Sequence, residues 1–391
     1  MSQKIFERKM KTYTTNIEVM LQEGYTERFA KCYLTQVEKE STMSCYNQEY
    51  ALWAHDHGFY AESACSYGLN DNNFANYLTD YDYYKVWPLN GWTRILINDK
   101  LTLKQLLDGS EFGELMPKYY FYTAQHGLLS LMDNPNKEGS VANFVQTLKK
   151  VGTFACKPCN GTTAIGFFAL SYREGKFYFN EDEIEECQFE QIITDHPNYI
   201  FTEYIRPAQY LKKYSDQIHT LRIVTLNSHG DNPIIAGGYL RFPNKNNGEA
   251  NYSVLGEKDI DRFNLFVELN PETGWFGNAK KTFINKVEST SIHPDTGAII
   301  DGYIRNFDKL KQMVLGIAQR FNTLEWMGFD IGVTENGFKC MEINSHPGIK
   351  YMQIFHPFFE NPLLERYFKS RIEKMKLLTK EQMRQRNHIL R

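Results

Sequence analysis

Alternating apolar and polar residues near the C-terminus predict a hairpin of two strands. Short apolar runs flank Glu335-Asn336-Gly337, and Asn-Gly is typical of a tight hairpin turn. Because side chains alternate between the two faces of a strand, Glu342 and Asn344 share one face. Asp330, on the partner strand, can point at the same place. The pattern therefore predicts a cluster of two carboxylates and one amide oxygen.

Hard oxygen ligands of this kind suit Mg²⁺, with Mn²⁺ as a second possibility. We expect Asp330, Glu342 and Asn344 to be the metal ligands. Met341 and Ile343 should face a core, which favours a cleft beside Glu342 and Asn344. A hairpin whose polar residues only face solvent is the alternative.

Helical spacing of apolar residues dominates residues 1–92. It predicts helices over residues 26–38 and 48–60, the second ending near Gly58. The aromatic stretch 77–92 is expected to be the seam that joins this helical region to the next domain. A ligand or partner surface is the alternative for this stretch.

Residues 93–205 mix the two periodicities and are expected to form a small α/β lobe. The predicted strands are 92–97, 154–158 and 199–205, with a hairpin of 167–171 and 176–180 and helices at 101–107 and 141–151.

Residues 206–361 are expected to form a larger lobe that includes the metal hairpin. Strands are predicted at 219–226 and 234–242, and the segment 243–251 reads as a mobile loop. Asn306 is predicted to cap a helix whose apolar stripe, including Leu310 and Ile317, faces a core.

The last segment, 362–391, has nine Lys or Arg residues against three Glu. Leu364, Phe368, Ile372 and Met375 predict an amphipathic helix that packs on the protein. Contact of this basic helix with an anionic membrane surface is the alternative.

Composition narrows the class of protein. At 391 residues the chain allows two to three domains, and its net charge of −3 argues against a nucleic-acid binder. No apolar run approaches the ~20 residues of a membrane span, and the charged N-terminus does not resemble a secretory signal. Seven cysteines without framework spacing indicate a reducing, cytoplasmic location. Cys156 and Cys159 read as ordinary thiols, because no second pair completes a zinc site.

A candidate phosphate-binding loop begins at the end of a predicted strand. Lys157 is followed by small residues that include Gly161, Thr162 and Thr163, whose backbone N–H groups can approach phosphate closely. The loop matches neither a P-loop nor a dinucleotide fingerprint, and an ordinary glycine turn is the alternative. Asn98-Asp99-Lys100, at an expected strand-to-helix junction, is a second candidate.

Arg222 lies in the middle of an apolar strand, where a positive charge is unfavourable unless it meets an anion. Contact with phosphate is expected, and a salt bridge with a core carboxylate is the alternative.

Taken together and in order, these elements resemble the ATP-grasp superfamily over about residues 95–360. The matching segments are Asp99-Lys100, Lys157-Pro158, 202–205, Arg222, Asp330 and Glu342-Ile343-Asn344. More narrowly, segments 220–225, 269–274 and 293–297 resemble the branch associated with sugar transfer and with teichuronopeptide or capsule assembly.

The resemblance implies a role for each matching residue. Lys100 and Lys157 would hold ATP phosphates, and Glu203, Tyr204 and Ile205 would form the hinge against adenine. Asp330, Glu342 and Asn344 would hold two Mg²⁺ ions, and Lys245 would be a lid contact to the γ-phosphate. Many ATP-grasp ligases have an arginine where this chain has Gly328, so Arg222 or Arg241 is expected to take that role.

The implied fold is α/β (α+β), with two antiparallel-sheet lobes clamping ATP and an N-terminal helical region. The implied function is ADP-forming ligation of a small-molecule or sugar carboxylate to an amine, in surface-polysaccharide biosynthesis. A small-molecule kinase on the same scaffold and a non-catalytic nucleotide-binding module of a polysaccharide assembly complex are the alternatives.

Overall fold

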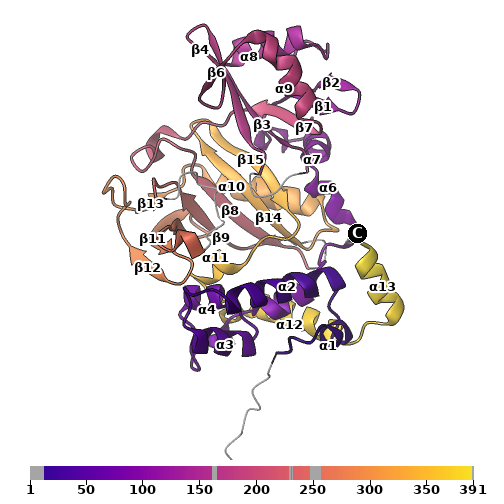
Figure 1. The fold of residues 1–391 in the computed structure, drawn as a ribbon, viewed down its shortest axis with the longest axis vertical. Coiled ribbons are helices and arrows are strands. Elements are labelled where there is room, and N and C mark those ends of the chain that lie inside the picture. The colour runs from indigo at the N-terminus through magenta and orange to yellow at the C-terminus, as the bar shows by residue number, and fades with distance from the viewer. Residues whose placement is uncertain (1–12, 161–164, 229, 231, 247–256, 390–391) are drawn as a thin grey trace, which may run out of the picture.

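Three bodies stacked along the long axis make up the computed structural model of the protein (Figure 1). The structure describes residues 13–160, 165–228, 230, 232–246 and 257–389. A small antiparallel sheet lies at one end, a large antiparallel sheet lies in the middle, and a helical layer lies at the other end. Among the described residues, no helix combines the length and the apolar character that crossing a bilayer requires.

The small sheet has the strand order β2-β1-β7-β3-β4-β5-β6. Its strands are β1 (Tyr119–Ala124), β2 (Gly127–Ser130), β3 (Thr153–Pro158), β4 (Phe168–Arg173), β5 (Lys176–Phe179), β6 (Asp182–Ile184) and β7 (Tyr199–Glu203). Helices α8 (Val141–Val151) and α9 (Phe189–Asp195) cover one face, where Phe144, Phe154 and Phe201 form the core. The other face is left for the large lobe.

Local signals account for α8, whose range matches the prediction. The Ser140 hydroxyl accepts from the Asn143 N–H at 3.2 Å and caps the start of the helix. Gly152, at φ 82°, ends the helix in a conformation that other residues rarely adopt.

The large sheet has the order β12-β11-β10-β9-β8-β14-β15, with β13 paired to β11. Its strands are β8 (Thr220–Leu226), β9 (Ile234–Phe242), β10 (Asn264–Leu269), β11 (Trp275–Thr282), β12 (Val287–Thr290), β13 (Gly302–Tyr303), β14 (Trp326–Thr334) and β15 (Gly337–Asn344). Helix α10 (Phe307–Arg320) packs on one face through the predicted stripe, which is buried. The opposite face holds the polar residues of the hairpin.

The helical layer combines both ends of the chain. It contains α1 (Ile17–Gln22), α2 (Glu27–Ser41), α3 (Gln48–Asp56), α4 (Ala61–Tyr67), α5 (Asp80–Lys85), α11 (Lys350–Gln353), α12 (Pro362–Met375) and α13 (Lys380–Ile389). Tyr83 and Trp87 share a core with Trp326 of β14 and Phe368 of α12. The aromatic stretch is therefore the predicted seam.

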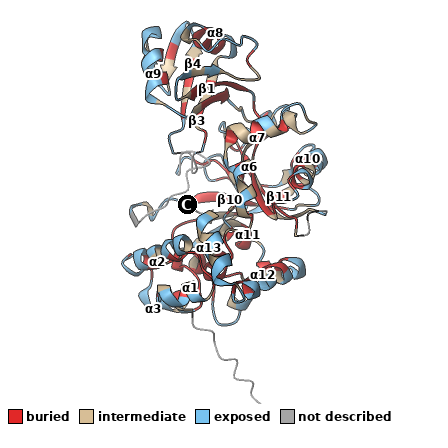
Figure 2. Ribbon diagram, turned by 90° about the vertical axis from the view of Figure 1, so that its right-hand side faces the viewer, coloured by how far each residue is buried: buried red, intermediate tan, exposed pale blue. Residues whose placement is uncertain are grey.

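The C-terminal basic segment forms two helices, and they differ in burial. The apolar stripe of α12 is buried against the large sheet, so it is not available to a lipid surface. Helix α13 has no buried residue and is mostly exposed (Figure 2).

Three local predictions were wrong. Residues 92–97 form no strand but a 3-10 turn, η2 (Gly91–Arg94), and helix α6 (Ile95–Asn98), because Trp92 and Ile95 face solvent instead of a sheet neighbour. Consequently Lys100 follows a helix-to-helix junction and begins α7 (Lys100–Leu107). Asn306 precedes α10, but its left-handed backbone at φ 59° leaves the side chain without a capping bond.

Candidate active site

The β14–β15 hairpin brings the predicted metal ligands together. Asp330 pairs directly with Glu342, and Gly328 pairs with Asn344. A β-bulge follows, because Ile331 pairs with Cys340 and leaves Met341 as the extra residue. Met341 is therefore only partly buried, contrary to the prediction, whereas Ile343 is 1% exposed. The bulge also turns the Met341 carbonyl toward Lys157.

A network of charged hydrogen bonds holds Asp330. Arg222 Nε donates to Asp330 Oδ1 at 2.6 Å, and Arg222 Nη2 donates to Oδ2 at 2.8 Å. Asn344 Nδ2 donates to the same Oδ2 at 2.9 Å. Burial alone would lower the pKa of Arg222, but the pairing with Asp330 outweighs it and raises the pKa. The salt-bridge alternative for Arg222 is the arrangement found.

Two lysines from the small-lobe side approach Glu342. Lys100 Nζ lies 3.9 Å from Glu342 Oε2, and Lys157 Nζ lies 3.5 Å from the Met341 carbonyl oxygen. Burial, with a further contribution from the nearby Lys100, lowers the pKa of Lys157 to about 8. Burial also raises the pKa of Glu342, although Lys100 opposes this. Both shifts mark charges that the protein alone does not fully compensate.

The start of α7 is tied to the base of the candidate phosphate loop. Asp99 caps α7 by accepting from the Thr102 N–H at 2.7 Å, and it also accepts from Asn160 Nδ2 at 2.8 Å. The Lys100 N–H donates to the Cys159 carbonyl at 3.2 Å. These bonds fix Lys100 beside Lys157. Gly161, Thr162 and Thr163 lie outside the described residues.

The predicted hinge lies where β7 leaves the small sheet. The Glu203 N–H donates to the Lys118 carbonyl at 2.8 Å, and the Glu203 carboxylate accepts from the Lys118 N–H at 3.1 Å. The main-chain groups of Tyr204 and Ile205 make no hydrogen bond to another described residue. Those two residues therefore leave polar groups that could read the edge of a base.

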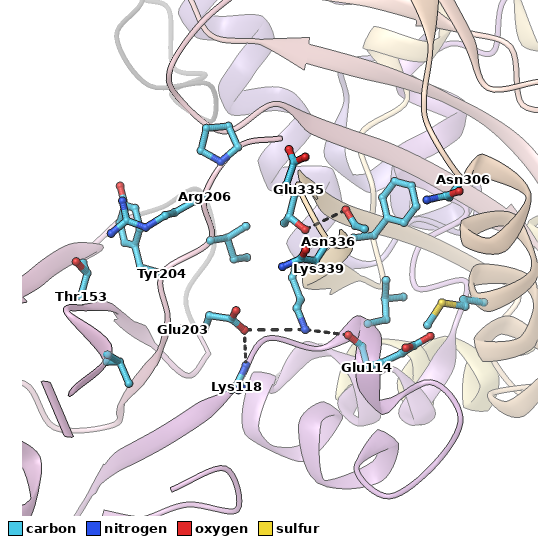
Figure 3. A pocket seen from close by; sticks show the side chains of 18 of the residues that line it. Glu114, Lys118, Thr153, Glu203, Tyr204, Arg206, Asn306, Glu335, Asn336 and Lys339 are labelled. Atoms are coloured by element: carbon cyan, nitrogen blue, oxygen red, sulfur yellow. Dashed lines mark hydrogen bonds and ion pairs between the residues drawn. The ribbon is translucent and has the colours of Figure 1, made fainter. Parts of the chain in front are cut away.

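A cavity of about 720 Å³ lies beside this hinge (Figure 3). Glu203, Tyr204 and Ile205 line it from the small-lobe side, and Glu335 and Lys339 line it from the hairpin. Its lining includes none of the residues predicted to bind phosphate or metal. The cavity thus adjoins the hinge, while the charged cluster around Glu342 lies outside its lining.

The remaining predicted residues lie farther along the large sheet. Arg241, on β9, packs over Phe266 and Tyr351, with its guanidinium carbon 5.3 and 5.9 Å from the two ring centroids. It shares a face with Tyr239, which pairs with Arg222. Lys245 is exposed, and its N–H donates to Asp295 at 2.8 Å. The segment 247–256, most of the predicted lid, lies outside the described residues.

The donor set fits a hard divalent cation. Asn344 presents its amide nitrogen to Asp330, which leaves its oxygen as a ligand, and a carboxylate has about four acceptor sites, so Asp330 keeps capacity. The raised pKa of Glu342 indicates a carboxylate that a cation would stabilise. Within the described part of the chain, no group of three or more His, Cys, Asp and Glu could hold a metal, so the candidate set combines two carboxylates with the Asn344 amide.

Gly328 is a functional position that the sequence indicated only as a departure from relatives. A Cβ there would collide with Pro347 and lie 3.5 Å from Arg222 Nη1. The absent side chain thus makes room for Pro347, whereas the distance to Arg222 is an ordinary van der Waals contact. A glycine inside a strand is a general signal of such close approach.

Comparisons with solved structures find distant ATP-grasp enzymes. The L-amino acid ligase of Bacillus licheniformis is 10% identical with a TM-score of 0.34, over 66% of this chain and 42% of that one. The D-alanine–D-alanine ligase of Bacillus anthracis is 13% identical with a TM-score of 0.34, over 72% of this chain and 67% of that one. D-alanyl-alanine synthetase A of Vibrio cholerae is 12% identical with a TM-score of 0.38, over 72% and 66%.

This chain thus spans less than half the length of the first of these enzymes. No curated protein sequence matches it. Residues 89–358, well over half of the chain, match the family described as sugar-transfer associated ATP-grasp. That range contains both sheets, the hinge, both lysines and the hairpin. The chain belongs to the sugar-transfer associated ATP-grasp family.

Proposed function

We propose that the protein is an ATP- and Mg²⁺-dependent carboxylate–amine ligase that works through an acyl phosphate. The observation that supports this most is one cluster of charged and polar side chains between the two lobes. Its positive members are Lys100, Lys157 and Arg222, and they lie around Asp330, Glu342 and Asn344. Positive groups for phosphate and oxygen ligands for a cation are the parts that phosphoryl transfer needs.

Binding of ATP would use the main chain of the hinge and the two lysines that approach Glu342. The adenine edge would meet the main chain of Tyr204 and Ile205, and the phosphates would meet Lys100 and Lys157. Phosphate would favour the charged form of Lys157, whose pKa burial has lowered. Asp330, Glu342 and Asn344 would hold Mg²⁺, which would supply positive charge to offset part of the charge on the phosphates.

In the first step, an oxygen of the substrate carboxylate attacks the γ-phosphorus. The bond from that phosphorus to the β–γ bridging oxygen breaks, and ADP leaves with the electron pair. Arg222 is fixed by Asp330 through Nε and Nη2, and Nη1 has no hydrogen-bond partner among the described residues. We assign Nη1 to the developing negative charge, because a preoriented guanidinium needs little rearrangement during the reaction.

In the second step, the amine nitrogen attacks the acyl carbon. The bond from that carbon to the phosphate oxygen breaks, phosphate leaves with the electron pair, and the amine gives up a proton. Arg222 would serve both steps. Its guanidinium lies beside Gly328, which is the position on β14 where many ATP-grasp ligases have an arginine. Arg241 is the second candidate for this role.

The family description supports a sugar among the substrates, and we propose a sugar or amino-acid carboxylate in surface-polysaccharide biosynthesis, handled in the cytoplasm. Carboxylates of both kinds can be screened for ATP-dependent release of ADP, with and without amines.

Hydroxylamine provides the decisive test, because it intercepts an acyl phosphate as a hydroxamate. Hydroxamate formation should require ATP, Mg²⁺ and the correct carboxylate, and Arg222→Met should abolish it. Arg305→Met, which removes an arginine stacked on Tyr210 outside the site, is the matched control and should form hydroxamate normally. A stable phosphorylated product without hydroxamate would establish a kinase instead, and absence of any turnover with bound ATP would favour a non-catalytic module.

A further inference from the structure

Asn90, which precedes η2 in the helical region, is buried at the end of the metal hairpin. It is 4% exposed, and its side chain uses all of its hydrogen-bonding capacity. Asn90 Oδ1 accepts from the N–H groups of Glu325 and Trp326 at 2.8 and 3.1 Å. Asn90 Nδ2 donates to the carbonyl oxygens of Trp326 and Ser345 at 2.7 and 3.1 Å. Two acceptor sites and two donors are the full inventory of a carboxamide.

Through these bonds the Asn90 side chain replaces the main-chain groups that a neighbouring strand would offer to Trp326. Gly328 pairs with Asn344, so the same register would pair Trp326 with His346. Strand β15 ends at Asn344, however, and the chain turns away through Ser345, His346 and Pro347. Asn90 bonds both the N–H and the carbonyl of Trp326, as a strand neighbour would.

Asn90 also fixes the first residue after Asn344. The Ser345 carbonyl would otherwise be a buried acceptor at the point where the ladder stops, and Ser345 is 6% exposed. Asn344 in turn donates to Asp330, which Arg222 holds from the other side. A shift of Ser345 would therefore move Asn344 relative to Asp330.

Two neighbours restrict the same segment from the same side. The Tyr83 hydroxyl donates to the Pro347 carbonyl and accepts from Trp326 Nε1 at 3.1 Å. Trp87 stacks on His346 with ring centroids 3.3 Å apart. Residues 83–90 thus contact 345–347 at three successive positions.

We propose that Asn90 is a positioning residue for the metal site, through which the helical region sets the geometry of Asp330 and Asn344. The inference rests on the proposed function, because it needs these residues to bind Mg²⁺ with the nucleotide. It goes beyond that function by giving the helical region a defined role in the site.

The test separates positioning from simple stabilisation. Titration calorimetry measures the affinity for ADP once in the presence of Mg²⁺ and once in the presence of EDTA. The ratio of these two affinities is the Mg²⁺-dependent gain in ADP affinity. Asn90→Ala should reduce this gain about tenfold, the lower end of the usual effect of altering a group that orients a metal ligand. Asn90→Asp keeps the acceptor bonds to Glu325 and Trp326 but turns a carboxylate oxygen toward the carbonyls of Trp326 and Ser345. It should therefore lower Tm and still show the reduced gain, and its melting curve checks that it is folded at the assay temperature.

Gln353→Ala is the matched control. Gln353 is a buried carboxamide, 1% exposed, that joins Leu78 to Phe358 through backbone hydrogen bonds away from Asn344. Gln353→Ala and Asn90→Ala should lower Tm to a similar extent, but only the Asn90 variants should lose the gain.

Each outcome has a defined meaning. An Asn90→Asp protein that keeps the wild-type gain would overturn the positioning role while leaving the proposed function intact. A Gln353→Ala protein that loses the gain equally would also overturn it, because any loss of stability would then suffice. A wild-type protein without any Mg²⁺-dependent gain would overturn the inference together with the metal assignment.

Discussion

Lys157 and Glu342 have opposite charges, and burial disfavours the ionised form of each. The two residues lie close together between the lobes, and the charge of Lys100 affects the pKa of both. Among the described residues, Glu342 makes a long salt bridge to Lys100, with Nζ and Oε2 3.9 Å apart, and the hydrogen bond of Lys157 Nζ is to the Met341 carbonyl. At the residue scale, the site is therefore poised for a ligand that brings both a cation and phosphate oxygens.

The pKa of Lys157 predicts a pH-dependent affinity for ADP. In the free protein this pKa is about 8, so Lys157 discharges as the pH rises through that value. Bound phosphate stabilises the charged form, so affinity should fall above that pH and binding should take up a proton. Calorimetry in two buffers of different ionisation enthalpy measures the uptake.

Lys157→Met should weaken ADP binding by about 1.5–3 kcal/mol and abolish the proton uptake, because a charge-assisted contact is lost. That energy corresponds to roughly ten- to more than a hundredfold in affinity. Lys149→Met, which removes an exposed lysine paired with Glu186 on α8, should behave as wild type. A flat pH profile in the wild-type protein would contradict the phosphate role.

Glu342→Gln should keep the fold and lose the effect of Mg²⁺ on nucleotide binding. A carboxyl group with a raised pKa favours folding only while protonated, and that contribution is lost as the pH rises through the raised pKa. At neutral pH its charge therefore does not stabilise the fold, and Tm should change little. Mg²⁺-dependent ADP affinity should fall by orders of magnitude, because a charged ligand is gone.

Glu183→Gln is the control, since Glu183 lies on β6 and pairs with Lys176 at 2.8 Å, outside the cavity and the charged cluster. Unchanged turnover of Glu342→Gln at limiting Mg²⁺ would refute the metal assignment.

At the element scale, one hairpin organises the site through its irregularities. The bulge at Met341 aims a carbonyl at Lys157, and the glycine at 328 admits Pro347. The two other family-like segments of the large sheet have a local role. In 269–274, Asn270 Oδ1 accepts from the N–H groups of Glu272 and Thr273, and in 293–297 His293 bonds the Asp295 N–H. Both motifs form turns, and Asp295 of the second also accepts from the Lys245 N–H at 2.8 Å.

Gly328→Ala should destabilise the protein by about 1–3 kcal/mol, because an added methyl group overpacks the contact with Pro347. Gly348→Ala is the control, because a Cβ there meets nothing within 4 Å and the backbone is unstrained. Chemical denaturation measures both, and equal stability of the two variants would argue against the close approach.

At the scale of the whole molecule, the helical layer is part of the large lobe. Leu78, Tyr83 and Val86 share a buried core with Trp326 and Phe368, which come from β14 and α12. Helices from both chain ends therefore pack on the same face of the sheet as Arg222 and Asp330, beside the polar cluster, whereas α10 covers the opposite face. The small lobe, in contrast, has its own core around Phe144 and Phe154.

A protein that begins at Trp87 should lose the cooperative unfolding of the large lobe. Removal of each large core side chain costs about 2–5 kcal/mol, so losing several of them approaches the whole stability of a typical domain. Calorimetric melting should show this loss, whereas Leu52→Ala, at a side chain that is 60% exposed, should leave melting unchanged. A truncated protein that melts like the full chain would contradict the shared core.

The sequence by itself determined the features that depend on neighbours along the chain. Two-residue alternation predicted the β14–β15 hairpin with Asp330, Glu342 and Asn344 on one side, and the local pattern of residues 141–151 predicted α8. Side-chain period and capping are local properties, so they can be read without the fold. The order of these elements was enough to indicate the family.

Only the tertiary structure decided which groups meet across the chain. It pairs Arg222 with Asp330 over 108 residues, and it brings Asn90 into the ladder of β14 over 236 residues. Residues 92–97 are helical for the same reason. Among the described residues, no strand of either sheet pairs with them. Partners so distant in sequence are selected by packing and by the need to satisfy buried polar groups, which no local pattern encodes.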